Sequence, residues 1–181
     1  MSKMPALFIG HGSPMNTLET NQYTEVWQTL GRDIPRPKAI LCVSAHWFIG
    51  STAVTAMPVP RTIHDFYGFP QALFDYQYPA AGAPQLASRV AELIKPDLTG
   101  LDRDQWGLDH GTWSILKQMY PTANIPTLQL SIDYHQNAQY HYDLGKELAK
   151  LRKKGVLIIG SGNMIHNLRM ATGATPNGFD W

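Results

Sequence analysis

The sequence has few of the features that mark secreted, membrane or nucleic-acid-binding proteins. It contains one cysteine, Cys42, so no disulfide can form within the chain, and the apolar run around this residue is typical of a buried strand. Fifteen basic and fourteen acidic residues give a net charge of +1, so no bulk field attracts nucleic acid or an anionic membrane. No apolar run approaches the roughly 18 residues that cross a bilayer. These absences predict a cytoplasmic protein whose partners include neither nucleic acid nor membrane.

The common local signatures of catalytic sites are also missing. The sequence has no HExxH or CxxC pair, which are the usual local zinc patterns. Ser161 lies in Gly-Ser-Gly, which is not the Gly-x-Ser-x-Gly elbow of hydrolases, so a serine nucleophile is disfavoured. A catalytic site in this chain would therefore have to be assembled from residues that the fold brings together.

Strand-like and helix-like patterns alternate along the 181 residues. Residues 39–43 and 156–159 are continuous apolar runs typical of buried parallel strands, and residues 126–132 are strand-like as well. Helical faces are indicated by the apolar stripes Tyr23, Val26, Trp27 and Leu30; Leu86, Val90, Leu93 and Ile94; and Tyr140, Leu144, Leu148 and Leu151. The pattern predicts one α/β domain over residues 1–181, with a mainly parallel central sheet flanked by helices.

A long proline-rich and aromatic segment interrupts this alternation at residues 58–84. It contains five prolines, of which Pro84 suits the first turn of a following helix. Long ordered loops in compact domains are usually functional, so we expect this segment to contribute to a binding site.

Three histidines directly follow strand-like runs, and they are the strongest chemical signal in the sequence. They are His11, His46 and His166. In open α/β sheets ligands bind outside the carboxyl ends of the strands, so these residues are expected to converge there. Neutral imidazole is the commonest metal ligand, and the three histidines therefore predict a metal site. Taken singly, His11 could instead lie in a solvent-facing turn, and His46 could be a hydrogen-bonded core residue.

Other candidates surround this predicted centre. His110 opens a helix over residues 111–119 and has no strand directly before it, which favours proton transfer or substrate positioning over metal ligation. His64, in the proline-rich segment, and Trp47, beside His46, are candidates for contact with a substrate. His135 and His141 are weaker candidates.

Five segments in order resemble the class III extradiol ring-cleavage dioxygenases, in the bacterial branch that acts on DOPA-like catechols. They are residues 10–14, 44–47, 62–70, 109–113 and 161–167, and the resemblance runs along essentially the whole chain. It implies a mononuclear non-haem Fe(II) site, which zinc can often occupy, held by His11, His46 and His166. It also implies that His110 transfers protons and that a catechol is opened by O₂ next to its two hydroxyls.

The resemblance also carries one departure. Family members continue well beyond the position that matches Trp181 and include a further metal-binding residue there, so the chain is expected to lack its C-terminal segment. Apolar surface left uncovered would favour a homo-oligomer. The alternatives are a zinc-dependent hydrolase that uses the same histidines to activate water, and a metal-binding fragment that does no chemistry.

Overall fold

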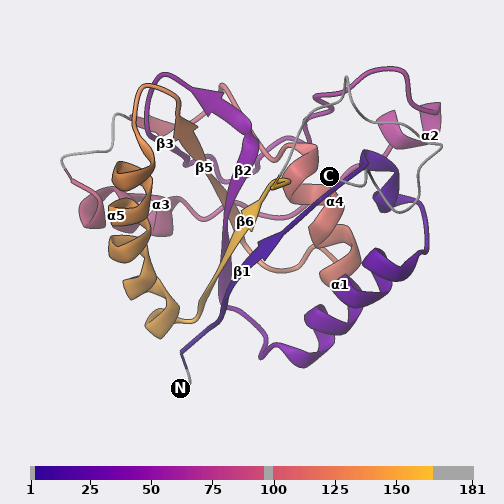
Figure 1. Ribbon diagram of the computed structural model, residues 1–181, viewed down its shortest axis with the longest axis horizontal. Coiled ribbons are helices and arrows are strands. Elements are labelled where there is room, and N and C mark those ends of the chain that lie inside the picture. The colour runs from indigo at the N-terminus through magenta and orange to yellow at the C-terminus, as the bar shows by residue number, and fades with distance from the viewer. Residues whose placement is uncertain (1–2, 96–99, 165–181) are drawn as a thin grey trace, which may run out of the picture.

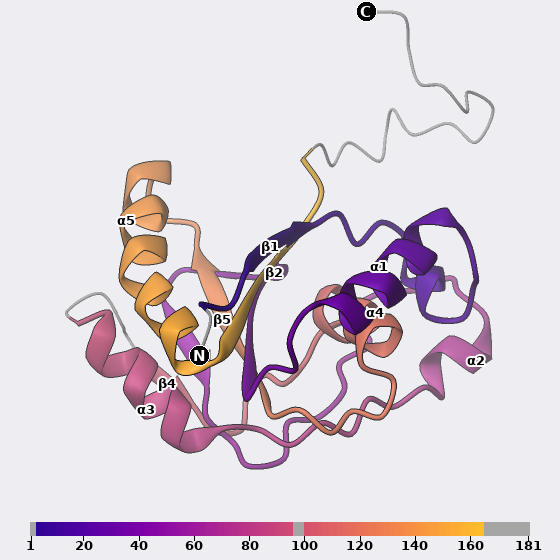
Figure 2. The ribbon, with the colours of Figure 1, turned by 90° about the horizontal axis from the view of Figure 1, so that it is seen from below.

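One six-stranded sheet forms the centre of the protein, between two layers of helices (Figure 2). The computed structural model describes residues 3–95 and 100–164. In spatial order the strands are β1 (Ala6–Ile9), β6 (Val156–Ser161), β2 (Ala39–Ile49), β5 (Thr127–Asp133), β3 (Ala53–Thr55) and β4 (Gly100–Asp102).

The sheet is mixed but mostly parallel. The first four strands in this order are parallel to one another, whereas β3 pairs with β5 in the antiparallel sense and β4 runs parallel to β3. The predicted α/β class with a mainly parallel sheet is thereby confirmed. The sequence patterns did not predict β3 and β4, because each has only three residues and is too short to show a period.

The helices divide between the two faces of the sheet (Figure 1, Figure 2). On one side lie α1 (Gln22–Asp33) and α4 (His110–Met119), and on the other lie α3 (Pro84–Leu93) and α5 (Ala138–Leu148). Shorter elements connect them, namely η1 (Pro14–Thr17), α2 (Gln71–Phe74) and η2 (Ala149–Lys154). Among the described residues, no helix combines the length and the apolar character needed to cross a membrane.

Each face of the sheet has its own apolar core, because successive residues of a strand point to opposite faces. In β2, Ile40 and Cys42 belong to the core beneath α1 and α4, whereas Leu41 between them belongs to the core beneath α3 and α5. All three side chains are fully or almost fully buried. Cys42 is therefore the buried apolar residue that its surroundings in the sequence predict.

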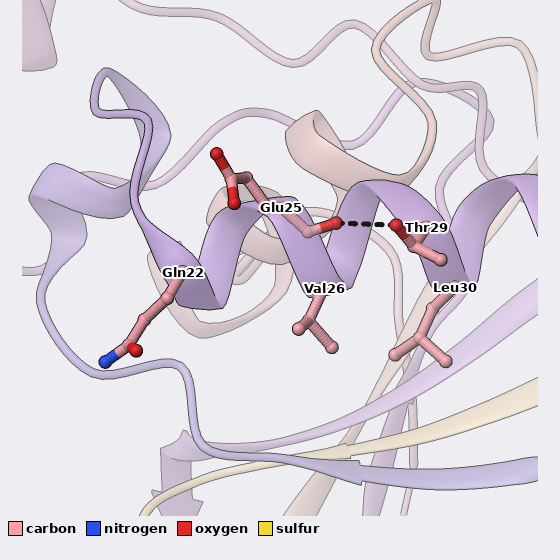
Figure 3. Close-up of a pocket in the computed structure, with 5 residues that line it drawn as sticks. All are labelled: Gln22, Glu25, Val26, Thr29 and Leu30. Carbon is pink, nitrogen blue, oxygen red and sulfur yellow. Dashed lines mark hydrogen bonds between the residues drawn. The ribbon is translucent and has the colours of Figure 1, made fainter.

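The helix α1 forms where it was predicted, but only part of the predicted apolar stripe is buried: Trp27 and Leu30 contact the core, whereas Tyr23 and Val26 do not. Tyr23 and Val26 are 60% and 57% exposed, while Thr24 and Trp27 are buried. The buried side faces α4, and Gln28 extends it through a hydrogen bond to Gln118 on that helix. The outer side carries a surface pocket lined by Gln22, Glu25, Val26, Thr29 and Leu30, shown in Figure 3. The buried side of α1 thus combines Trp27 with polar residues, which an apolar pattern does not register.

Gly31 allows α1 and α4 to approach closely, and this generates a stability prediction. A Cβ atom at this position would overlap the backbone carbonyl of Met119. We expect Gly31→Ala to lower the free energy of unfolding by about 1–3 kcal/mol, because the helices must separate. Gly145 in α5 is a matched control with no atom within 4 Å of an added Cβ. Its replacement by alanine should raise stability by about 0.4–1 kcal/mol. Chemical denaturation measures both, and equal effects would contradict the close helix contact.

Candidate metal centre

Three histidines lie together at the carboxyl edge of the parallel strands. They are His11, His46 and His110, and one ring nitrogen from each lies within 4.8 Å of the others. His11 and His110 are buried, at 2% and 4% exposure, and His46 is partly buried. The part of the chain that the structure describes contains this one group of potential metal ligands.

The strand register explains why His11 and His46 meet. Ser161 at the end of β6 is level with Ile9 of β1 on one side and with Ser44 of β2 on the other. His11 and His46 each come two residues after this level, on or after the two strands that flank β6, so they lie at the same height of the sheet. The strand containing His46 is longer than the predicted 39–43, and His46 lies within it, where the pairing with β5 shifts register between Val43 and Phe48.

The start of α4 brings His110 to the same place. Asp109 caps this helix by accepting a hydrogen bond from the backbone N–H of Thr112 at 3.2 Å. Gly111 then lies so close to β2 that an added Cβ would be 2.6 Å from Ser44 Oγ and 3.1 Å from His46 Cδ2. A glycine at this position lets the helix start against the strand, which places the His110 and His46 ring centres 4.0 Å apart.

Ser161 fixes the proton on His11. The Ser161 hydroxyl donates its only hydrogen to the backbone carbonyl of Gly111, so toward His11 it can only accept. His11 Nδ1 lies 2.9 Å from this hydroxyl and therefore carries the ring proton. The lone pair is then on Nε2, which lies 3.0 Å from Nε2 of His46. The serine, judged an improbable nucleophile from its sequence context, holds a histidine in one tautomer.

Asp65 lies behind the other two rings. Its Oδ1 accepts from both the backbone N–H and Nδ1 of His110, at 3.0 Å and 2.9 Å, and its Oδ2 lies 3.1 Å from Nδ1 of His46. A carboxylate oxygen beside Nδ1 favours the proton on that nitrogen, which leaves Nε2 with the lone pair in both rings. All three imidazoles thus keep their protons on the outer side, which suits a metal held by the inner nitrogens.

Two acids near the histidines, the partly buried Asp65 and the fully buried Asp109, have opposite pKa shifts. Burial pushes the pKa of Asp65 upward, but hydrogen bonding and attraction from His110 and His46 outweigh it and hold the pKa well below its usual range. Burial raises the pKa of Asp109, and the nearby charge of Asp65 raises it further. Hydrogen bonds from Ser44 and Gln129 oppose that rise only in part. Asp65 is therefore the charged carboxylate beside the histidines.

The remaining predicted residues lie in different surroundings. His64 contacts the carbonyl oxygen of Tyr76 through Nε2 at 2.9 Å, and its ring packs against Phe66, which also contacts His110. Trp47 is 3% exposed and stacks on Trp106. His166 lies outside the described residues, so its predicted place at the centre stays a prediction.

Sequence reasoning assigned no role to Asp65, and none to Ser161 beyond that of an improbable nucleophile. Asp65 is 45 residues from His110 in the chain, and Ser161 is 150 residues from His11. The one available signal was the position of Asp65 beside His64 in the proline-rich segment, which had been predicted to be functional. No local pattern connects a carboxylate to a histidine over such separations.

Comparison with known proteins agrees with the fold and the histidine centre. Residues 5–180 match the family described as the catalytic LigB subunit of aromatic ring-opening dioxygenase, and the chain belongs to this family. The resemblance that the sequence motifs indicated is thereby confirmed. Three histidines placed for a metal are thus found in a member of an extradiol dioxygenase family.

Particular relatives share much of the sequence. The chain is 57% identical to a 4,5-DOPA dioxygenase extradiol of Escherichia coli (strain K12), over 93% of this chain and 62% of that protein. It is 41% identical to one from Beta vulgaris, over 88% and 61%. A crystal structure of an uncharacterized protein from Escherichia coli K12 matches with a TM-score of 0.80 and 49% identity, over 94% and 64%. The chain spans about three fifths of the length of these curated relatives.

The pairing of His46 with Asp65 predicts how stability depends on pH in the metal-free protein. Burial lowers the pKa of His46, but pairing with Asp65 raises it by more, so the net pKa lies above its ordinary value. A raised folded-state pKa contributes stability that is fully present below the unfolded value of about 6.5 and is lost as pH rises through the folded value.

We therefore compare the free energy of unfolding of the wild type with that of His46→Gln, measured by denaturant titration in the presence of a chelator. The free energy of unfolding of the wild type should exceed that of His46→Gln by the largest amount near pH 5–6, and this difference should shrink by pH 9. An advantage that stays constant or grows over this range would contradict the pairing.

Proposed function

We propose that this chain carries the metal centre of an extradiol dioxygenase that opens the ring of a DOPA-like catechol with O₂. The observation that carries the proposal is the orientation of the three imidazoles, whose Nδ1 atoms face Ser161 or Asp65. This leaves the Nε2 lone pairs of His11 and His46 for a metal and that of His110 for a proton, and one ring nitrogen from each histidine lies within 4.8 Å of the others. Family membership and the names of the relatives support the choice of reaction.

The donor set fits a divalent transition metal. Imidazole nitrogen suits both Fe(II) and zinc, and the hydrogen bonds behind each ring orient it toward the metal. We assign His11 and His46 as ligands, together with His166 on the strength of the family resemblance. When bound, a single Fe(II) supplies the redox chemistry and the open positions that a catechol and O₂ require.

His110 is proposed to carry a proton. Rings that share one metal through bonds of about 2 Å hold their centres roughly 5 Å apart. The centres of His11 and His46 are 4.8 Å apart and those of His11 and His110 are 5.3 Å apart, so either pair suits a shared metal, whereas His46 and His110 are only 4.0 Å apart. The family resemblance assigns His46 as the ligand, and His110 is then the residue that is not a ligand. With Nδ1–H held by Asp65, Nε2 of His110 can accept a proton from a catechol hydroxyl. The charge of Asp65 stabilises the imidazolium that results.

Aromatic side chains provide surroundings that suit a catechol. Phe66 contacts both His110 and His64, which supports His64 as a residue near the substrate. Trp47 is buried against Trp106, so we propose that it supports the part of β2 that carries His46. Exposed apolar side chains such as Phe8 and Val26 support self-association, and a cytoplasmic location remains our prediction.

The ligand assignment predicts which variants lose metal. His11→Ala and His46→Ala should bind zinc or Fe(II) at least about tenfold more weakly with little loss of fold, because each removes a ligand that lies outside the two apolar cores. His110→Ala should retain the metal. Metal titration with circular dichroism measures both properties, and His141→Ala on α5, bonded to the backbone of Asp133, is the control. Metal loss in His110→Ala would make that residue a ligand instead.

The reaction is tested by oxygen uptake. The chain reconstituted with Fe(II) is given L-DOPA and O₂, beside the Escherichia coli relative, while catechol loss and ring-opened product are followed optically. We expect catechol and O₂ to be consumed in equal amounts. His110→Ala should lower the rate by about 10²–10⁴-fold. Hydrolysis of esters or amides under argon with zinc, without ring opening, would favour the hydrolase instead. Metal binding without either reaction would identify a binding fragment.

A further inference from the structure

We propose that Asp65 is a positioning residue that fixes the ring protons of His46 and His110 together, and that aspartate is required because both of its oxygens must accept. The inference rests on the proposed function only where it concerns metal affinity. Its main observation is that one carboxylate faces two imidazoles. Oδ1 is hydrogen-bonded to Nδ1 of His110 at 2.9 Å, and the buried Oδ2, which has no hydrogen bond to any other described residue, makes an ion-pair contact of 3.1 Å with Nδ1 of His46. A metal-binding histidine is usually oriented by an outer partner, and here the partner of His46 is shared with His110, which couples the two rings.

The carboxylate is well placed for this role. The Asp65 side chain is 17% exposed, and its Oδ1 accepts two hydrogen bonds from the same residue, one from the backbone N–H and one from Nδ1 of His110. The backbone N–H belongs to the first turn of α4, where it has no partner within the helix. Asp65 therefore joins the proline-rich segment to the start of α4 and to β2.

The other acid nearby cannot replace it. Asp109 is fully buried and already accepts from the backbone N–H of Thr112 and from the side-chain amide of Gln129. The carboxylate of Asp109 serves the cap of α4, whereas that of Asp65 serves the rings.

The variant Asp65→Asn distinguishes the effect of the side chain's shape from its effect on where the ring protons of His46 and His110 lie. The asparagine side chain has nearly the shape of aspartate, but it offers one accepting oxygen and one donating amide group. The oxygen is expected on the side of His110, because two N–H groups donate there. The amide group then faces Nδ1 of His46, which must accept. The ring proton of His46 must then move to Nε2, the nitrogen that faces His11. A proton on Nε2 removes the lone pair with which His46 would bind a metal.

The test reads the ring protons directly in the metal-free protein. Long-range ¹H–¹⁵N spectra recorded at alkaline pH distinguish a ring proton on Nδ1 from one on Nε2. Each signal is assigned by its loss in a variant in which one histidine is replaced. We expect the Nδ1–H form for His46 and His110 in the wild type. In Asp65→Asn, His46 should change to the Nε2–H form while His110 keeps its own.

Metal affinity is the second measurement. Asp65→Asn should bind zinc or Co(II) about 10–100-fold more weakly, as is typical when an outer partner of a ligand is removed. Asp75→Asn is the matched control, because this exposed carboxylate lies in the same segment and accepts from Gln71. It should leave both the tautomers and the affinity unchanged. Circular dichroism and thermal unfolding establish that both variants are folded.

The outcomes separate this inference from the proposed function. An Nε2–H form of either ring in the wild type would overturn the role of Asp65, and so would an unchanged His46 in folded Asp65→Asn. If the tautomers behave as expected but the wild type binds no metal, the positioning role stands and the proposed metal chemistry fails.

Discussion

The close approach of the first turn of α4 to β2 at Gly111 is the constraint on which the histidine centre depends. No side chain larger than hydrogen fits there, because Ser44 and His46 occupy the space. The same residue accepts a hydrogen bond from Ser161 through its carbonyl group, and Ser161 in turn holds His11. One backbone position thus fixes the distance between β2, β6 and α4. The three imidazoles have their mutual geometry because these elements cannot move apart independently.

The histidine centre is a cluster of polar groups next to two apolar cores. Its stability depends on a hydrogen-bond or ion-pair partner for each buried polar group. Unpaired buried polar groups would cost the protein several kcal/mol. Here Ser161 has partners on both sides, Asp65 faces two imidazoles, and Asp109 is held by Gln129 and the helix cap. The contacts of Ser161 and Asp65 are the same ones that select the ring tautomers. Structural integrity and suitability for a metal therefore arise from a single network.

The location of the site agrees with the general behaviour of parallel sheets. Ligands bind beyond the carboxyl ends of the strands, where loops from neighbouring strands diverge. The edge strands β3 and β4 lie on the far side of β5 from β1 and β6, so their reversed direction does not alter the edge where the histidines meet.

The sequence by itself determined the fold class, the buried nature of Cys42 and the histidines worth considering, because these depend on local patterns and on chemistry that each residue carries alone. It placed His11 and His46 after strands, and the register of β1, β6 and β2 then brings them together. Only the tertiary structure decided which face of α1 is buried, that His110 joins the other two rings, and that Asp65 and Ser161 stand behind them. Those contacts join residues up to 150 positions apart and depend on hydrogen-bond geometry between elements. The local periodicity of a sequence contains no information about contacts between residues so far apart or about the hydrogen-bond geometry between elements.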